Sequence, residues 1–424
     1  MKHYTSFPFT RISYGLMFFL IGGLGLLSSC KEEDPTQPRK ASGPPSIQAV
    51  RSTDPAKSDS TFTQSTLGSI IVIVGNNLEA TQYVAFNGYQ TPVNPVYATN
   101  THLIVRVPDQ VPTVATAGSV PNELTVVSPG GEATYAFTVL PPPPVVEAIS
   151  NEFAKAGETI TLYGNYFYFV EEVRFPGGVT STEFTASPNG KSLTVKVPAG
   201  VDPAATTNGE LRVQGQSGLS AVNEKIKFND AIGMIENWDD KTQGGYWGKV
   251  TTSSPTIQPI DRNFMSIIMP IPGSYGWNEN KARHFTDWGG AQIYPTSPGG
   301  ANQIYDPNAA IGNFELRMEV AAVTSALDDI VVQMVAYTAD GTELQAAVPL
   351  TDFVRSTDGK WYTVGIPLGS LAKGDVKLAK YSDLLNGKSG ANHAFRIIFN
   401  KTTAGASPNV ELAYDNVRVV NVTR

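Results

Sequence analysis

Three tryptophans stand in segments typical of loops rather than of strands. Trp247 lies between glycines in QGGYWGK, Trp277 in GSYGWNEN and Trp288 in TDWGG. Proteins rarely expose several large aromatic rings together unless something binds there. A flat ring can stack on the C–H face of a sugar, so we expect two of these rings to form a platform for a polysaccharide chain. The alternative is a loop that folds back and buries the rings in a secondary core.

Polar side chains near these tryptophans have the donors and acceptors that sugar hydroxyl groups need. Asn278 follows Trp277 directly, and Arg283 lies a few residues further on. Three tyrosines of this region are second choices for the platform. The predicted glycan-binding residues are Trp247, Trp277, Trp288, Tyr246, Tyr275, Tyr294, Asn278 and Arg283.

Composition and motifs argue against nucleic-acid binding and against catalysis. The 424 residues carry a net charge of −7 and no run of Lys and Arg, whereas nucleic-acid binders present basic surfaces. G-x-S-x-G and H-E-x-x-H motifs are absent, and the chain has four histidines. We therefore expect no enzyme. A jelly-roll glycoside hydrolase remains a rival, because carboxylates for a catalytic pair stand in the same region. They are Glu236, Asp239, Asp240, Glu279 and Asp287.

The N-terminal segment has the pattern of an export signal. A basic start precedes the apolar run YGLMFFLIGGLGLL, and Leu-Ser-Ser-Cys ends at Cys30, the one cysteine. This ending resembles the lipobox of bacterial lipoproteins, which implies a signal peptide over 1–29, lipidation of Cys30 and an outer-membrane lipid anchor. The polar segment 30–44 is expected to be a flexible tether. Its acidic start resembles the surface-export signal of Bacteroidetes lipoproteins, so we expect the protein to face the cell exterior. An uncleaved membrane anchor and a chance cysteine in a cleaved signal are the alternatives.

Two segments in the middle of the chain repeat each other. GSIIVIVGNNLEATQYVAFNG and GETITLYGNYFYFVEEVRFPG lie at a constant offset of 89 residues, which pairs Gly75 with Gly164. Short alternating strands with Gly, Pro and Asn turns predict a small β-sandwich for each repeat. We expect a backbone bend or a positive φ at both glycines. The shared pattern resembles the IPT/TIG family of immunoglobulin-like domains, which we assign to 45–140 and 144–229, with Pro141 to Pro144 between them.

The region 230–424 contains all five tryptophans and is again rich in strand patterns. One larger jelly-roll β-sandwich accounts for it best. We expect Trp238 and Trp361 to lie in its core. The opening ENWDD and the ending AYDNV resemble carbohydrate-binding modules of jelly-roll type, which often hold a structural calcium ion. Calcium prefers oxygen ligands, and strand-end turns are the alternative role for these acids. The calcium candidates are Glu236, Asp239 and Asp415.

The whole arrangement resembles the surface glycan-binding proteins of Bacteroidetes polysaccharide-utilisation loci. The resemblance is greatest to those whose final domain binds xyloglucan or a related β-glucan or hemicellulose. It implies an all-β chain of two immunoglobulin-like sandwiches and a jelly roll, in which the first two are spacers and the last binds the polysaccharide. It also makes an outer-membrane glycan importer complex a candidate partner. A surface adhesion protein that binds another protein is the alternative, since Trp and Tyr also dominate protein interfaces.

Overall fold

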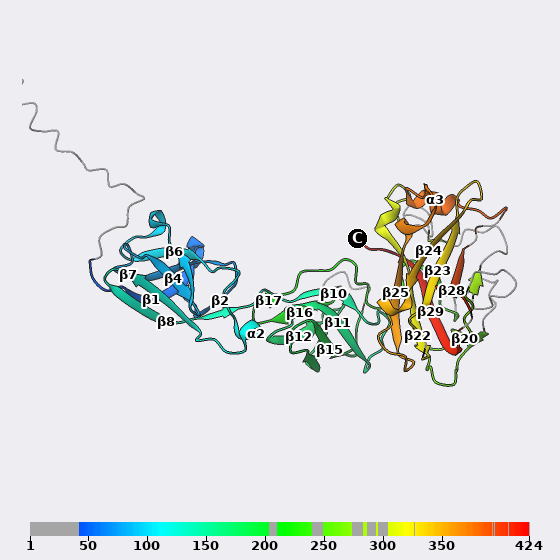
Figure 1. The fold of residues 1–424 in the computed structure, drawn as a ribbon, viewed down its shortest axis with the longest axis horizontal. Coiled ribbons are helices and arrows are strands. Elements are labelled where there is room, and N and C mark those ends of the chain that lie inside the picture. Colours follow the sequence, from blue (N-terminus) through cyan, green and yellow to red (C-terminus); the bar gives the residue numbers. More distant parts are fainter. Residues whose placement is uncertain are drawn as a thin grey trace, which may run out of the picture. The chain divides into compact units, whose positions relative to one another are not determined.

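The computed structural model describes residues 42–202, 210–239, 249–273, 283–285, 294–295, 304–325, 327–391, 393, 395–405 and 407–423. These residues form a nearly all-β chain, as predicted (Figure 1). The chain divides into two compact units. The first unit is Met1–Thr113 with Ser119–Val139, and the second is Val114–Gly118 with Leu140–Arg424. None of the helices in the described part has the length and hydropathy that a membrane-spanning helix needs.

The first unit is a β-sandwich around one apolar core. Strand β6 shows why it forms, because Leu103 and Val105 are buried while Ile104 and Arg106 between them are exposed. The three-stranded sheet is β1 (Ser46–Ser52), β3 (Ile70–Asn76) and β6 (His102–Arg106). The four-stranded sheet is β5 (Tyr89–Pro92), β4 (Tyr83–Phe86), β7 (Glu123–Ser128) and β8 (Gly131–Ala136). A small pair is β2 (Gln64–Thr66) with β9 (Thr138–Leu140).

The second sandwich repeats this plan within the second unit. One sheet is β10 (Val145–Ile149), β11 (Thr159–Asn165), β15 (Ser192–Lys196) and β14 (Phe184–Ala186). The other sheet is β13 (Thr180–Ser181), β12 (Val170–Arg174), β16 (Arg212–Gly215) and β17 (Gly218–Leu219). Phe167 and Phe175 are buried in its core, and Phe175 packs edge-on against Phe228 at 5.2 Å between ring centroids. The repeat in the sequence is therefore a repeat of core positions.

The two repeat glycines are required for close backbone approach. A Cβ atom at Gly75 would lie 1.8 Å from a carbonyl oxygen of β1, and one at Gly164 would lie 1.9 Å from a carbonyl oxygen of β10. The clear positive φ angles fall two residues later, at Asn77 (58°) and Tyr166 (61°). Gly75 is not among the residues with a positive φ, and Gly164 has a φ of 159°, so the left-handed residue is the one after the repeated Gly-Asn pair.

The third sandwich is larger and holds the main core between two six-stranded sheets (Figure 1). The first sheet is β19 (Lys249–Thr251), β20 (Phe264–Pro270), β29 (Asn409–Asn421), β22 (Phe314–Val323) and β25 (Trp361–Pro367), with β18 (Met234–Glu236) paired to β29. The second sheet is β21 (Arg283–Phe285), β28 (Arg396–Lys401), β23 (Ile330–Tyr337), β24 (Glu343–Pro349), β26 (Ala372–Lys373) and β27 (Val376–Lys377). The predicted larger β-sandwich is confirmed.

Short helical segments connect strands of the first and the third sandwich. They are η1 (Pro55–Lys57), η2 (Pro95–Tyr97), α2 (Val114–Ala117), η3 (Ile311–Asn313), η4 (Leu350–Asp352), η5 (Leu368–Ser370) and α3 (Tyr381–Asn386).

The two tryptophans expected in the core have different surroundings. Trp238 is 2% exposed and packs edge-on against Tyr414 at 5.8 Å, which confirms the prediction. Trp361 is only half-buried and packs edge-on against Phe264 in a small satellite cluster. Its indole Nε1 donates to the backbone oxygen of Gln258 at 2.7 Å. The prediction of a core position for Trp361 is therefore corrected to a partly exposed position at the start of an edge strand.

Candidate functional site

Most of the residues predicted to bind glycan lie outside the described residues. This holds for Trp247, Trp277, Trp288, Tyr246, Tyr275 and Asn278, and also for the lipidation candidate Cys30. Arg283 is the first residue of β21, and its backbone pairs with Ile398 of β28. Trp277 precedes β21 in the sequence and Trp288 follows it. The predicted platform segments therefore flank the edge strand of the second six-stranded sheet along the chain.

Tyr294 belongs to the main core rather than to an exposed platform. Its side chain is 3% exposed, and its ring packs against Phe395 at 5.9 Å between centroids. Burial raises the pKa of its hydroxyl well above the ordinary value. A ring packed in this way has no open face for a sugar, so Tyr294 is removed from the predicted platform.

The outer face of the second six-stranded sheet carries a continuous row of hydrogen-bonded polar side chains. Asn400 Nδ2 donates to Gln333 Oε1 at 2.7 Å, and Gln333 Nε2 donates to Gln345 Oε1 at 2.8 Å. Gln345 Nε2 then donates to Glu343 Oε1 at 2.8 Å. Arg396 Nη1 completes the row by donating to Glu343 Oε2 at 3.0 Å. We call these five residues, which come from β28, β23 and β24, the amide ladder.

The strand alternation explains why the ladder lies on the outer face. Val332 and Met334 point into the main core, so Gln333 between them points away from it. Gln333 and Glu343 are partly exposed and Gln345 is exposed, whereas Arg396 and Asn400 are buried. The ladder therefore runs from a buried part of the sheet to an open one.

The chemistry of the ladder suits a neutral, hydroxyl-rich ligand. Each amide presents both donors and acceptors, and mutual hydrogen bonds fix their orientation. The Arg396 guanidinium lies 5.4 Å from the centroid of the Tyr337 ring and pairs with Glu343, so the two charges of the ladder compensate each other. Sequence reasoning missed these residues because it treated IVVQMVAYTA only as a core strand. The signal that it overlooked was a glutamine at the outward position of an apolar run.

The acidic residues proposed for calcium do not form a cation site among the described residues. Glu236 and Asp415 are fully buried, and the Asp239 carboxylate accepts from Asn263 and lies 3.4 Å from Arg262. In the described part of the chain, no group of three or more His, Cys, Asp or Glu side chains is placed to hold a metal ion. Burial raises the pKa of Asp415 to about 9.

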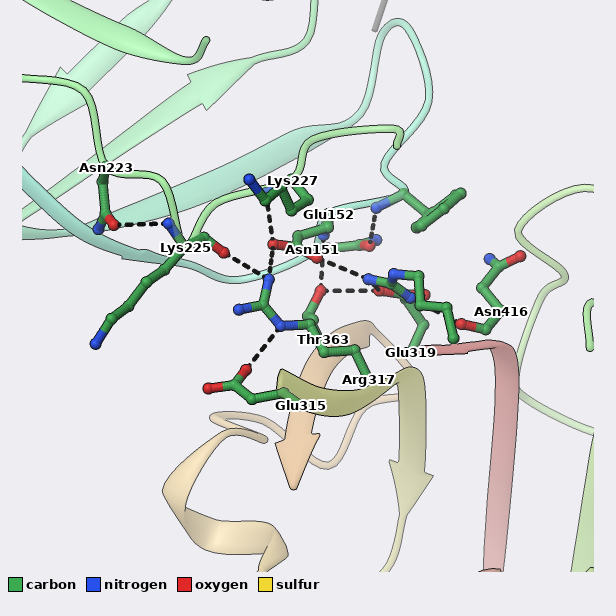
Figure 2. Close-up of polar contacts among 12 residues, drawn as sticks. Asn151, Glu152, Asn223, Lys225, Lys227, Glu315, Arg317, Glu319, Thr363 and Asn416 are labelled. Carbon is green, nitrogen blue, oxygen red and sulfur yellow. Dashed lines mark hydrogen bonds and ion pairs between the residues drawn. The ribbon is translucent and has the colours of Figure 1, made fainter. Parts of the chain in front are cut away.

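A second polar cluster joins the second sandwich to the third (Figure 2). Glu152, in the loop between β10 and β11, accepts from Arg317 Nη1 at 2.6 Å and from Arg418 Nη2 at 2.7 Å. Arg418 also donates to both oxygens of Glu319, at 2.8 and 3.0 Å. Thr363 links the two carboxylates, because its hydroxyl donates to Glu319 and accepts from the backbone N–H of Glu152. We call these five residues the junction network.

The junction network holds two positive and two negative charges away from water. The charged side chains are at most 8% exposed. Burial by itself raises the pKa of Glu152, but the charges of Arg317 and Arg418 outweigh burial, so its pKa lies below the ordinary 4.5. Burial raises the pKa of Glu319, and Arg418 offsets this only in part. Such buried charges are stable only together, so the network ties the second and third sandwiches to each other.

Comparisons with known proteins agree with this architecture. Residues 228–421 match the family described as the surface glycan-binding protein B xyloglucan binding domain. An IPT/TIG domain-containing protein of Bacteroides ovatus is 36% identical over 160 residues, which cover 37% of this chain and 32% of the relative. The matched part therefore spans about a third of the length of that relative.

Two solved structures share the fold over most of the chain. A surface glycan-binding protein from Prevotella bryantii has a TM-score of 0.56 and 21% identity, with 90% of this chain and 100% of that chain covered. A protein from a complex xyloglucan utilization locus in Bacteroides uniformis has a TM-score of 0.51 and 19% identity, with 89% and 99% covered. The predicted resemblance to Bacteroidetes surface glycan-binding proteins with IPT/TIG domains is confirmed, and so is the fold class.

Proposed function

We propose that this protein is a non-catalytic, cell-surface lipoprotein that captures a neutral β-glucan, of the xyloglucan type, on its third sandwich. The observation that carries the proposal is the amide ladder. It presents fixed hydrogen-bonding groups on the outer face of a sheet, inside the region that matches a xyloglucan-binding family.

In the proposed mode of binding, aromatic rings and amide side chains contact different parts of the glycan. Rings of two of Trp247, Trp277 and Trp288 would stack on the sugar faces, and Gln333 and Gln345 would bond to the hydroxyl edges. Trp277 and Trp288 flank β21 in the sequence, and β21 pairs with β28 of the ladder sheet. Because the two charges of the ladder compensate, a neutral chain fits it better than one rich in uronic acids.

The remaining parts of the chain would present this site to the polysaccharide. We assign 1–29 to the signal peptide, 30–44 to the lipidated tether at Cys30, and 45–140, 144–229 and 230–424 to the three sandwiches. The protein would face the cell exterior from an outer-membrane lipid anchor and pass its glycan to an importer complex. It would hydrolyse nothing itself.

Affinity electrophoresis of the full mature chain tests the proposal, with gels that contain xyloglucan, mixed-linkage β-glucan, mannan or pectin. We expect retardation by a neutral β-glucan, no retardation by pectin and no release of reducing ends. Gln333→Ala and Gln345→Ala should each weaken binding by about 0.5–1.5 kcal/mol, the usual net worth of one hydrogen bond. Gln90→Ala is the matched control, because Gln90 is an exposed strand glutamine of the first unit.

Three results would refute the proposal. Wild-type protein that is retarded by no glycan would favour the protein-adhesion alternative. If the ladder variants are retarded as strongly as Gln90→Ala, the glycan does not bind at the amide ladder. Release of reducing ends by the pure protein would instead support the alternative that it is a glycoside hydrolase.

A further inference from the structure

A cleft of about 590 Å³ opens where the second sandwich meets the third, and both sandwiches belong to the second compact unit. One wall is the outer face of the β10–β11–β15–β14 sheet, where Thr161 of β11 stands opposite Thr194 of β15. The other wall is the start of β25 together with the segment that contains Thr256 and Gln258. Its volume lies in the range of small-molecule sites, which is ~300–1,000 Å³.

Trp361 gives this cleft an aromatic wall. It is half-buried, and two contacts fix its ring. The indole N–H donates to the backbone oxygen of Gln258 at 2.7 Å, and the ring meets Phe264 edge-on at 5.7 Å with an interplanar angle of 82°. A ring that is held in place and still partly exposed can stack on a sugar without losing further side-chain freedom.

The rest of the lining is polar but nearly neutral. Thr159, Thr161 and Thr194 line the wall that the second sandwich supplies, and their hydroxyl groups can both donate and accept hydrogen bonds. On the opposite wall Lys360 Nζ lies 2.8 Å from Asp358, so these two charges compensate each other. Glu158 is the further charged residue among the described lining residues. The lining therefore suits a neutral, hydroxylated ligand better than a charged or an apolar one.

The junction network keeps the walls of the cleft in place. Next to the cleft, the backbone N–H of Thr363 in β25 donates to the oxygen of Ser150 at 2.8 Å, and Glu152 is bound by Arg317 and Arg418. Removing these bonds would leave buried charges unpaired, so the two walls do not separate easily. The cleft is thus formed before any ligand arrives, which lowers the free-energy cost of binding.

We propose that this junction cleft is a second glycan-binding site, which takes a short neutral oligosaccharide segment between Trp361 and the threonine wall. The inference rests on the proposed function, because it assumes that the protein meets glycans. It extends that function by giving the second sandwich a part in binding. A polysaccharide chain that reaches both the ladder and the cleft would bind more tightly than to either site alone.

The test fills the cleft without touching its buried neighbours. Thr194→Trp adds a large ring to the threonine wall, and Thr185→Trp is its matched control. Thr185 is also an exposed threonine and pairs with Thr194 from β14, but it does not line the cleft. Binding is measured by calorimetry with xyloglucan polymer and with xyloglucan-derived oligosaccharides, on the full mature chain. A second arm repeats both measurements in the Gln333→Ala, Gln345→Ala background, where the ladder is weakened.

We expect Thr194→Trp to weaken polymer binding by about tenfold relative to Thr185→Trp, because linked sites reinforce each other. It should also abolish the oligosaccharide binding that remains in the ladder-weakened background. Equal affinities of the two tryptophan variants in both backgrounds would overturn the cleft site.

A second pair of variants keeps the proposal testable, and the pattern of results separates the two proposals. If Thr194→Trp does not fold, Lys360→Ala removes an exposed donor of the cleft without adding bulk, and Lys373→Ala is its control on an exposed strand end. Unchanged binding in Lys360→Ala would then overturn the proposal. Wild-type protein that binds no glycan at all would refute the proposed function itself. Ladder variants that weaken binding while the cleft variants do not would refute the cleft alone.

Discussion

Glu152 is the residue whose removal most directly tests how the second and third sandwiches are joined. It belongs to the second sandwich, yet both of its charged partners, Arg317 and Arg418, belong to the third. Glu152→Ala leaves the buried junction network with two positive charges and one negative charge. Glu319 still pairs with Arg418, and Glu315 still pairs with Arg317 at 2.8 Å, so the network is weakened rather than dissolved.

The expected cost follows from burial. Removing one partner of a buried ion pair costs about 3–5 kcal/mol, because the remaining charge stays out of water without its counter-ion. An exposed pair is worth ~0–1 kcal/mol. Glu172→Ala supplies that comparison within the same sandwich, because Arg174 lies 2.7 Å from Glu172 while their side chains are 43% and 28% exposed. The two variants remove the same group from pairs of similar length, so the difference between them measures burial.

Tryptophan fluorescence during urea unfolding reads the effect in the third sandwich. All five tryptophans follow residue 237, so the signal does not come from the sandwich that carries the mutation. We expect Glu152→Ala to lower the fluorescence-monitored free energy of unfolding by about 3–5 kcal/mol, and Glu172→Ala to change it by at most about 1 kcal/mol. A fluorescence transition that is unmoved in Glu152→Ala would refute the argument that the two sandwiches are stabilised together.

The same residue gives the stability a dependence on pH. Because the folded-state pKa of Glu152 lies below the ordinary 4.5, its contribution is fully present above that value and is lost as the pH falls through the lowered pKa. The difference in stability between wild type and Glu152→Ala should therefore shrink in acid. A difference that stays constant from pH 7 to pH 3 would contradict the assignment of an ionised Glu152.

Three further outcomes are expected from single substitutions. Gly164→Ala places a Cβ atom 1.9 Å from the oxygen of Val145 and should cost about 1–3 kcal/mol or more in urea unfolding; a neutral effect would show that β10 can move away. Trp361→Ala should cost about 1–3 kcal/mol, less than the ~3–5 kcal/mol of a fully buried tryptophan, because its ring is half-buried. The pKa of Asp415 is raised from 3.8 to about 9, so wild type should lose stability relative to Asp415→Asn as the pH rises between these values. Thermal midpoints at pH 5, 7 and 9 without calcium check this last prediction, and a variant that is less stable at all three would indicate that Asp415 is held ionised.

The fold could be predicted from the sequence because its signals are local and repeated. Alternating strands bounded by Gly, Pro and Asn occur twice at one offset, and each alternation marks one buried face. The function of the repeat glycines was predicted only in part. Sequence shows that Gly75 and Gly164 are equivalent, but not that a facing carbonyl oxygen excludes a side chain there. Close approach is a property of two strands, and one strand does not reveal it.

The candidate site was harder to predict because Asn400 lies 67 residues after Gln333, on a strand that the sequence does not link to the hairpin of β23 and β24. Gln333, Gln345 and Asn400 each look like an ordinary polar position on a half-buried strand. They become a site only when β23 pairs with β24 on one side and with β28 on the other. The aromatic prediction concentrated on loops, and it misplaced Tyr294 because its neighbours Gln292 and Pro295 gave no sign of a buried ring.

The junction network gives the second immunoglobulin-like sandwich a structural role beyond that of a spacer. Arg418 stands in AYDNVRVV, where a charged residue in the last strand would ordinarily face solvent. It is instead fully buried, because a carboxylate 266 residues away reaches it from the other sandwich. A sandwich that supplies this carboxylate and a wall of the junction cleft is more than a spacer. The junction is fixed by charges that neither side can leave unpaired, so the second and third sandwiches should move as one body.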